Sequence, residues 1–176
     1  HYPFDGNAND ATPYNNHGVI GGNPIFQPAT HPLGAGKQNI KFDGDKDSVL
    51  VKNAVQLISD FTTVSFWIRV DNVNTKDPEA YIIDFGHWSE RWKISLPQHL
   101  KIVLTTNGNN TQFPSFISDM DSGDGNELVK GIWWHVTMVH DGAKNIIYVN
   151  GQQVATKPVP TKLNSTNRPL CFGSNN

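Results

Sequence analysis

Short apolar runs that recur at intervals of about ten residues are the feature that most limits what this chain can fold into. Between residues 61 and 154, β-branched and aromatic residues alternate or cluster in runs of strand length, and turn-forming residues separate the runs. No segment keeps a helical period; the nearest candidate, Ala54 to Phe61, covers about two turns and leads into a strand. The pattern therefore predicts an all-β fold. The predicted strands are Asn39 to Phe42, Ser48 to Val51, Thr62 to Val70, Tyr81 to Phe85, Trp92 to Leu96, Leu100 to Thr105, Trp133 to His140, Asn145 to Val149, Gln152 to Thr156 and Leu170 to Gly173.

Turn chemistry supports hairpins at two places. Asn150-Gly151 separates two apolar runs, and this pair tolerates the positive φ angles that a type I′ turn requires. Asp141-Gly142 is expected to form the preceding hairpin in the same way. In contrast, Gly6 to Gly36 and Asn107 to Gly131 are rich in Gly, Asn, Pro and Ser, with few apolar anchors. We expect these two segments to be long surface loops.

Length and charge narrow the possible organisation and partners. The 176 residues, 37% of them hydrophobic, are enough for one core, so we expect a single domain over residues 1–176. With 14 basic and 16 acidic residues, the chain has no broad attraction for nucleic acid or an anionic membrane surface. Its one cysteine, Cys171, cannot form an internal disulfide. No apolar run approaches the ~20 residues of a membrane span, and residues 1–4 lack the features of a signal peptide, so we expect no membrane insertion and any export signal outside this chain.

Four segments carry motifs that occur in the same order in one family. Residues 2–10 (YPFDGNAND) match an opening strand and loop, and residues 40–49 (IKFDGDKDSV) match a hairpin with the pattern FDG. Residues 61–68 (FTTVSFWI) match a strand with the pattern fTvSfWv. Residues 133–151 contain WWHV, DG and IYVNG in the order of the pattern WhHv…dG…lYvDG. Together these segments resemble laminin-G-like jelly-roll domains of the concanavalin-A-like lectin and glucanase superfamily.

Three departures from the family pattern stand out. Ser48 replaces the usual aromatic residue of the FDG hairpin, and Asn150 replaces an Asp. The family also continues after its equivalent of Leu170 to Gly173 with a final strand, whereas this sequence ends at Asn176. Either the sequence is a fragment, or that strand comes from elsewhere.

The resemblance implies a two-sheet antiparallel β-sandwich of the concanavalin-A-like jelly-roll type. It also implies a secreted or cell-surface binding module that is not an enzyme, either carbohydrate-binding or adhesive, whose partner is a glycan or an extracellular protein. A structural or protein-interaction spacer is the alternative. A glycoside hydrolase is the distant third, because glucanases of this fold carry E-x-D-x-x-E on one strand, and this motif is absent. Glu79, Glu90 and Glu127 are the only glutamates, and each falls in a predicted turn or loop.

Most of the conspicuous aromatic residues lie within predicted strands. Trp133 and His135 share one face of their strand at the two-residue period, and Trp67 lies in the middle of another. We expect these three side chains, with Phe66 and Tyr148, to be buried or half-buried between the sheets, with the His135 ring hydrogen-bonded to a neighbour. The side chains should fill that space and leave no interior pocket, so any ligand should bind at the surface.

The loop around Trp88 is the predicted ligand site. Trp88 lies in a connecting turn beside His87, Glu90 and Arg91. An exposed indole stacks on a sugar ring while neighbouring donors and acceptors bind its hydroxyl groups. In the alternative, Trp88 folds back and caps one end of the sandwich. For Trp92 we expect core packing.

Three clusters of oxygen-bearing residues are candidate calcium sites. They are Asp5, Asn7, Asn9 and Asp10; Asp43, Asp45 and Asp47; and Asp119, Asp121, Asp124 and Glu127. Calcium takes six to eight oxygen ligands, but none of these clusters fits the EF-hand spacing. The resemblance to the family points to a structural calcium held by Asp10 and Asn16 of the first loop and by Asp43 or the Gly44 carbonyl. The final strand of the family would supply another carboxylate, and a solvated turn is the alternative for every cluster.

Overall fold

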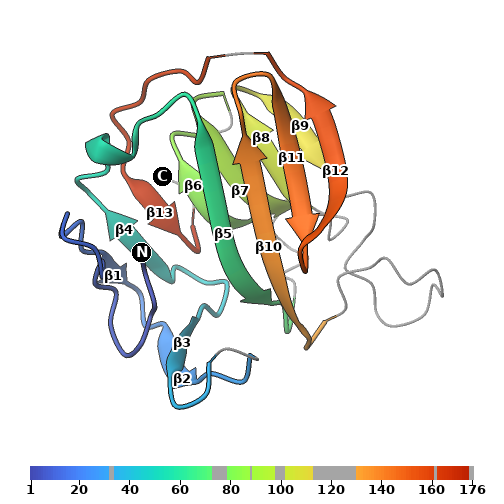
Figure 1. Ribbon diagram of the computed structural model, residues 1–176. Coiled ribbons are helices and arrows are strands. Elements are labelled where there is room, and N and C mark those ends of the chain that lie inside the picture. Colours follow the sequence, from blue (N-terminus) through green and yellow to red (C-terminus); the bar gives the residue numbers. More distant parts are fainter. Residues whose placement is uncertain are drawn as a thin grey trace.

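The computed structural model describes residues 1–31, 34–72, 79–87, 89–97, 102–112, 130–160 and 162–174. Two antiparallel sheets face each other as a β-sandwich (Figure 1), which confirms the predicted fold. The seven-stranded sheet has the order β1-β4-β13-β6-β7-β8-β9, and the four-stranded sheet has the order β12-β11-β10-β5. A separate hairpin, β2-β3, lies below β1 and β4 in Figure 1.

The strands of the seven-stranded sheet are β1 (Val19–Gly21), β4 (Ser48–Val51), β6 (Glu79–Phe85), β7 (Trp92–Pro97), β8 (Val103–Thr106), β9 (Asn109–Gln112) and β13 (Leu170–Phe172). Those of the four-stranded sheet are β5 (Thr62–Arg69), β10 (Trp133–His140), β11 (Lys144–Val149) and β12 (Gln152–Pro158). The hairpin consists of β2 (Ile25–Pro28) and β3 (Gln38–Lys41). One 3₁₀ turn, η1 (Val55–Leu57), occupies part of the segment that carried the weak helical signal. Among the residues described here, no helix is long and apolar enough to cross a membrane.

All ten predicted strands are present, with ends that differ by a few residues. Asn150 and Gly151 have φ angles of 49° and 81°, both positive as a type I′ turn requires. The β10-β11 hairpin is also present, but its turn differs from the prediction. There the carboxylate of Asp141 accepts hydrogen bonds from the backbone of Ala143 and Lys144, and only Gly142 needs a positive φ, 82°. Asp141 therefore organises a wider turn through its side chain.

The predicted long loops contain three further strands. β1 and β2 lie within residues 6–36, and β9 lies within residues 107–131. β9 carries the polar sequence Asn-Asn-Thr-Gln, and its strand conformation comes from antiparallel pairing with β8. Tertiary pairing here overrides a composition that is typical of turns.

The core lies between the two sheets and is built from alternate residues of each strand. β10 contributes Val136 and Met138, and β11 contributes Ile147 and Val149. Trp92 of β7 is 6% exposed and packs against Phe85 with ring centroids 5.8 Å apart, which confirms its core position. On β5, Val64, Phe66 and Ile68 face the same core but are only half-buried.

A groove opens along the β5 side of the sandwich. The four-stranded sheet lies over β7 to β9, whereas β1, β4, β13 and part of β6 extend beyond it, to the left in Figure 1. The groove has a volume of about 2180 Å³ and runs around the β5 edge, because both core-facing residues such as Phe66 and Leu170 and outer-face residues such as Trp67 and Trp133 line it. The prediction that side chains would fill all the space between the sheets is therefore wrong, because the shorter sheet leaves one side of the sandwich uncovered.

Candidate functional site

Four rings form a cluster on the outer face of the four-stranded sheet. Trp67 of β5 and His135 of β10 are direct cross-strand partners, with ring centroids 5.2 Å apart. His31, from the segment after β2, stacks on Trp67 at 5.4 Å and meets the edge of Trp133 at 5.3 Å. The three strand-borne rings, of Trp67, Trp133 and His135, are half-buried, so part of each ring faces solvent. We call His31, Trp67, Trp133 and His135 the ring cluster.

Hydroxyl groups lie next to the ring cluster. The Ser65 hydroxyl lies 2.9 Å from Nε2 of His135 and 3.1 Å from the Thr137 hydroxyl. The Trp133 indole N–H donates to the Thr30 hydroxyl at 2.8 Å, which ties the segment after β2 to the sheet. Alternate residues of two neighbouring strands thus place flat aromatic rings and groups that can donate or accept hydrogen bonds on one surface.

Arg69, whose guanidinium lies beside the Trp133 ring, is already paired with a carboxylate. Arg69 donates to both carboxylate oxygens of Asp71, at 2.7 and 3.1 Å, and its guanidinium lies 5.6 Å from the centre of the Trp133 ring. Lys41 also approaches Asp71, at 3.4 Å. These contacts hold the pKa of Asp71 below its ordinary value, chiefly through the hydrogen bonds from Arg69. The surface beside the rings therefore suits a ligand without net charge.

The structure corrects the predicted direction of Trp67, Trp133 and His135. These side chains are half-buried, but they face outward, because the intervening residues of β5 and β10 pack into the core. Both sides of these strands carry large rings, so hydrophobicity alone did not distinguish them. The two sides differ in their polar residues. Ser65 and Thr137 project from the same side of the strands as Trp67 and Trp133, and a solvent-facing side accommodates such polar side chains more readily than the core does. Tyr148 pairs with Thr137 and is also half-buried on this outer side.

The predicted site around Trp88 is only partly described. Trp88 itself lies outside the described residues. His87 is half-buried, and its backbone N–H donates to Asp84. Glu90 accepts a hydrogen bond from the Thr166 hydroxyl at 2.8 Å and lies 3.8 Å from the Arg168 guanidinium.

Arg91 was expected at the surface of that loop but is 1% exposed. Its guanidinium donates to the Ser59 carbonyl at 2.7 Å and to the Asn164 carbonyl at 3.4 Å, and it lies 5.2 Å from the centre of the Phe85 ring. Arg91 therefore joins two chain segments from the inside and offers no donor to a surface ligand. This correction has a clear physical reason, because five N–H donors in a fixed fork can satisfy several loop carbonyls at once.

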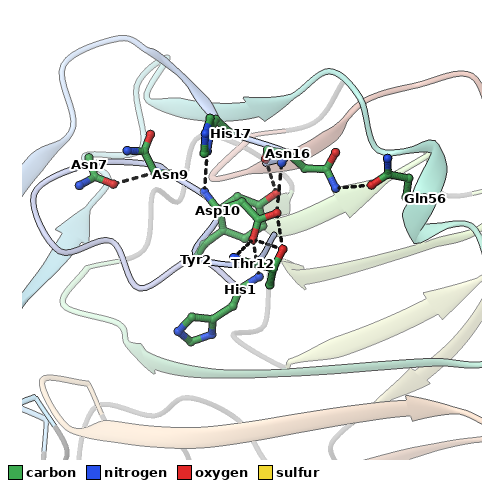
Figure 2. A network of polar contacts seen from close by, with 9 residues as sticks. All are labelled: His1, Tyr2, Asn7, Asn9, Asp10, Thr12, Asn16, His17 and Gln56. Atoms are coloured by element: carbon green, nitrogen blue, oxygen red, sulfur yellow. Dashed lines mark hydrogen bonds and ion pairs between the residues drawn. The ribbon is translucent and has the colours of Figure 1, made fainter. Parts of the chain in front are cut away.

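Asp10, a predicted calcium ligand, lies at the centre of the polar network shown in Figure 2. One of its carboxylate oxygens accepts from the backbone nitrogens of His1 and Thr12, both at 3.0 Å. The other accepts from the Asn16 backbone N–H at 3.1 Å, and the Thr12 hydroxyl reaches both oxygens at 2.8 Å. Burial raises the pKa of Asp10, but these hydrogen bonds outweigh it and hold the pKa well below its ordinary value. Nearby, burial and the Asp10 charge raise the pKa of Tyr2 to about 12.

The residues predicted to bind calcium do not form one ligand set here. Both oxygens of Asp10 face N–H and O–H donors, which a cation would have to displace. Asn16 is close to Asp10, but its side-chain amide donates to Gln56 at 3.1 Å. Asp43 and Gly44 lie in a separate turn, where Asp43 accepts from the Asp45 backbone and donates its own N–H to Asp47. Among the described residues, no group of three or more His, Cys, Asp or Glu side chains is arranged to hold a metal ion. The residues in this arrangement do not fit a calcium ion.

Comparisons with known proteins identify one family. The family model described as the concanavalin A-like lectin/glucanases superfamily matches residues 43–176. No curated protein has a matching sequence.

Several solved structures have a similar fold. The binding domain of Paraclostridial mosquitocidal protein 1 has a TM-score of 0.71 and 21% identity, over 93% of this chain and 41% of that one. The binding domain of botulinum neurotoxin DC, solved in complex with SialylT, has a TM-score of 0.66 and 23% identity, over 94% of this chain and 40% of that one. Botulinum neurotoxin type C, whose cell entry depends on interaction with two ganglioside molecules, has a TM-score of 0.64 and 21% identity, over 93% and 39%. The chain thus spans about two fifths of the length of these solved chains.

Proposed function

Because this chain belongs to the concanavalin A-like lectin/glucanases superfamily, we propose that it is a non-catalytic carbohydrate-binding module whose ligand docks on the ring cluster. The observation that carries the proposal is the arrangement of Trp67, Trp133 and His135 on the outer face of the sheet, with the Ser65 hydroxyl 2.9 Å from the His135 ring. The apolar face of a sugar ring stacks on an indole, and its hydroxyl groups exchange hydrogen bonds with hydroxyl and imidazole groups.

The chemistry of the surface narrows the ligand class. Arg69 donates two hydrogen bonds to the Asp71 carboxylate, so its guanidinium is not free to bind an anionic ligand beside the ring cluster. The proposed ligand is therefore a neutral or weakly charged glycan. One stacked ring contributes only about 1 kcal/mol beyond its burial. Affinity for a single sugar is therefore weak, and firm attachment requires long glycans or repeated modules. A module with such a ligand acts outside the cell, in a secreted or cell-surface protein.

The similar solved chains support a glycan as the ligand but do not locate a site. SialylT is bound to the neurotoxin DC binding domain, and ganglioside interaction is attributed to the type C toxin. Each is a property of a chain of which the matched part is about two fifths. The loop of Trp88, with His87 and Glu90, remains a second candidate position for the same function.

The test is a screen of the isolated chain against an array of neutral and sialylated glycans, followed by titration calorimetry with a hit. Trp67→Ala and Trp133→Ala should each weaken binding about tenfold, since stacking and burial of one ring together correspond to about 1.4 kcal/mol. Tyr14→Ala is the matched control, because Tyr14 is an aromatic residue of the first loop that is 69% exposed and is not part of the ring cluster.

Two results would redirect the proposal. If both tryptophan variants bind as the unmodified chain does and Trp88→Ala does not bind, the Trp88 loop is the site. If no glycan binds, the carbohydrate-binding function is refuted and the alternative of a protein-interaction or spacer domain is favoured.

A further inference from the structure

Tyr148 extends the outer face of the four-stranded sheet beyond the ring cluster. It lies on β11 opposite Thr137 of β10, and Thr137 lies opposite Ser65 of β5. On its other side Tyr148 pairs with Gln153 of β12, which is exposed. Directly opposite residues of an antiparallel sheet project to the same face, so these four side chains form one line across all four strands. We call Ser65, Thr137, Tyr148 and Gln153 the cross-strand row.

The cross-strand row begins next to Trp67. Trp67 and Ser65 are alternate residues of β5, and Nε2 of His135, the cross-strand partner of Trp67, lies 2.9 Å from the Ser65 hydroxyl. Two strand spacings of about 4.8 Å and two residues of about 3.4 Å place the backbone positions of Trp67 and Tyr148 roughly 12 Å apart. A sugar ring is about as wide as the tyrosine ring itself, so one sugar cannot stack on both side chains.

The groups between these two aromatic rings are polar. The Ser65 hydroxyl lies 3.1 Å from the Thr137 hydroxyl, and Ser65 is exposed while Thr137 is half-buried. A hydroxyl has one donor and two acceptor positions, so each keeps hydrogen-bonding capacity for a ligand while the two bond to each other. The surface thus presents a ring, a pair of hydroxyls and a second ring in succession. This order matches the apolar faces and hydroxyl groups that alternate along a glycan chain.

Protein occupies the opposite direction from Trp67. His31 stacks on Trp67 with ring centroids 5.4 Å apart, and it contacts the edge of Trp133 at 5.3 Å. The Trp133 indole N–H donates to the Thr30 hydroxyl at 2.8 Å, which holds this segment against the sheet. A ligand that stacks on Trp67 therefore has its open path along the cross-strand row.

The rings on this face are not coplanar. The planes of Trp67 and His135 are inclined by 55°, and those of His31 and Trp133 by 69°. Neighbouring strands of a sheet are also rotated by about 20° relative to each other. A crystalline polysaccharide presents a plane, whereas a single chain rotates about its glycosidic bonds and can follow this twist. The surface therefore suits a single soluble chain.

We infer that the ligand is a single soluble glycan chain of more than one sugar ring, which stacks on Trp67, passes the hydroxyls of Ser65 and Thr137 and stacks again on Tyr148. Tyr148 is thus a second stacking subsite, and the Gln153 amide beside it can donate and accept hydrogen bonds. The inference rests on the proposed function, because it names the ligand class and a further binding residue of the same surface.

The experiment titrates the chain with soluble sugars and follows its backbone amides by nuclear magnetic resonance. The probes are glucose, N-acetylglucosamine and mannose, each as the monosaccharide and as a linear hexasaccharide. At least one hexasaccharide should bind about tenfold more tightly than its monosaccharide, because it stacks on one further ring. The amides of β11 around Tyr148 should shift with that hexasaccharide and not with the monosaccharide.

Variants of the second ring separate its stacking from its hydroxyl group. Tyr148→Ala should remove the tenfold gain and leave the affinity for the monosaccharide unchanged, whereas Tyr148→Phe keeps the ring and should keep most of the gain. Tyr14→Ala, at an exposed tyrosine of the first loop, is the matched control and should bind both sugars as the unmodified chain does. The amide shifts of the unmodified chain decide the question even if Tyr148→Ala does not fold.

The outcomes distinguish this inference from the proposed function. If Trp67→Ala weakens binding but the hexasaccharides bind no more tightly than the monosaccharides, the inference is wrong and the glycan site at the ring cluster stands. The same conclusion follows if Tyr148→Ala keeps the full gain, or if crystalline cellulose or chitin binds in preference to every soluble hexasaccharide. If no sugar binds, or if Trp67→Ala binds as the unmodified chain does, the proposed function fails and this inference fails with it.

Discussion

Replacement of Asp10 by Asn should destabilise the fold by about 3 kcal/mol at pH 7. The carboxylate, 6% exposed as a residue, accepts hydrogen bonds from the backbone nitrogens of His1, Thr12 and Asn16 and from the Thr12 hydroxyl. An asparagine keeps one acceptor oxygen and places an NH₂ group against the remaining donors. A hydrogen bond to a charged group contributes about 1.5–3 kcal/mol, so the loss of one to two such bonds gives this magnitude.

The measurement is urea denaturation of the unmodified chain and of Asp10→Asn at pH 7 and at pH 3. Because the native pKa of Asp10 lies below the value of about 3.9 for an unfolded aspartate, its stabilising contribution is complete above pH 4. The contribution is lost as the pH falls below that value toward the native pKa. The stability difference between the two proteins should therefore be largest at neutral pH and smaller at pH 3.

Asp45→Asn is the control, since Asp45 is exposed and contributes its backbone N–H, not its carboxylate, to the hydrogen bond with Asp43. A surface change of this kind should alter the free energy of unfolding by no more than about 0.5 kcal/mol. The reasoning about the Asp10 network is refuted if Asp10→Asn behaves like Asp45→Asn at pH 7. It is also refuted if the difference between Asp10→Asn and the unmodified chain stays constant between pH 7 and pH 3.

Three further outcomes follow from burial and contacts. Trp67→Ala should cost only about 1–2 kcal/mol, whereas Ile147→Ala, at a position 0% exposed, should cost about 2–5 kcal/mol; equal losses in chemical denaturation would contradict the outward placement of Trp67. Arg91→Ala should cost about 3 kcal/mol or more, because the carbonyls of Ser59 and Asn164 lose their buried donor, and a melting temperature within 2 °C of the unmodified chain would argue against that role. Melting curves recorded with calcium and with chelator should coincide, since donors occupy the oxygens of Asp10; a rise of several degrees with calcium would restore the predicted metal site.

Most of the fold could be predicted from the sequence, because the strand signal is local. Period-two runs bounded by turn residues located ten strands, and Asn150-Gly151 located one hairpin with its turn type. The strands that were missed depend on partners distant in sequence. β1 has three residues and pairs with β4, and β9 has four polar residues and pairs with β8. Nothing within such short segments distinguishes a strand from a loop until the partner is known.

The candidate site was harder to predict, because it depends on which side of a strand faces solvent. In residues 61–68, phenylalanine and tryptophan are adjacent, so each side of the strand carries a large ring. The core-facing side is recognised only by comparing alternate residues. Val64 and Ile68 lie on the same side as Phe66, whereas the polar residues Ser65 and Arg69 lie on the same side as Trp67. His31 could not have been assigned to the site from its position, because it reaches Trp67 through tertiary packing alone.

β5 combines three different surfaces in eight residues, and the geometry of a strand explains how. Alternate side chains project to opposite faces, so Val64, Phe66 and Ile68 build the core while Ser65 and Trp67 remain available on the outer face. The backbone edge is perpendicular to both faces and is independent of the side chains. A substitution at Trp67 therefore tests the ring cluster with little effect on the core.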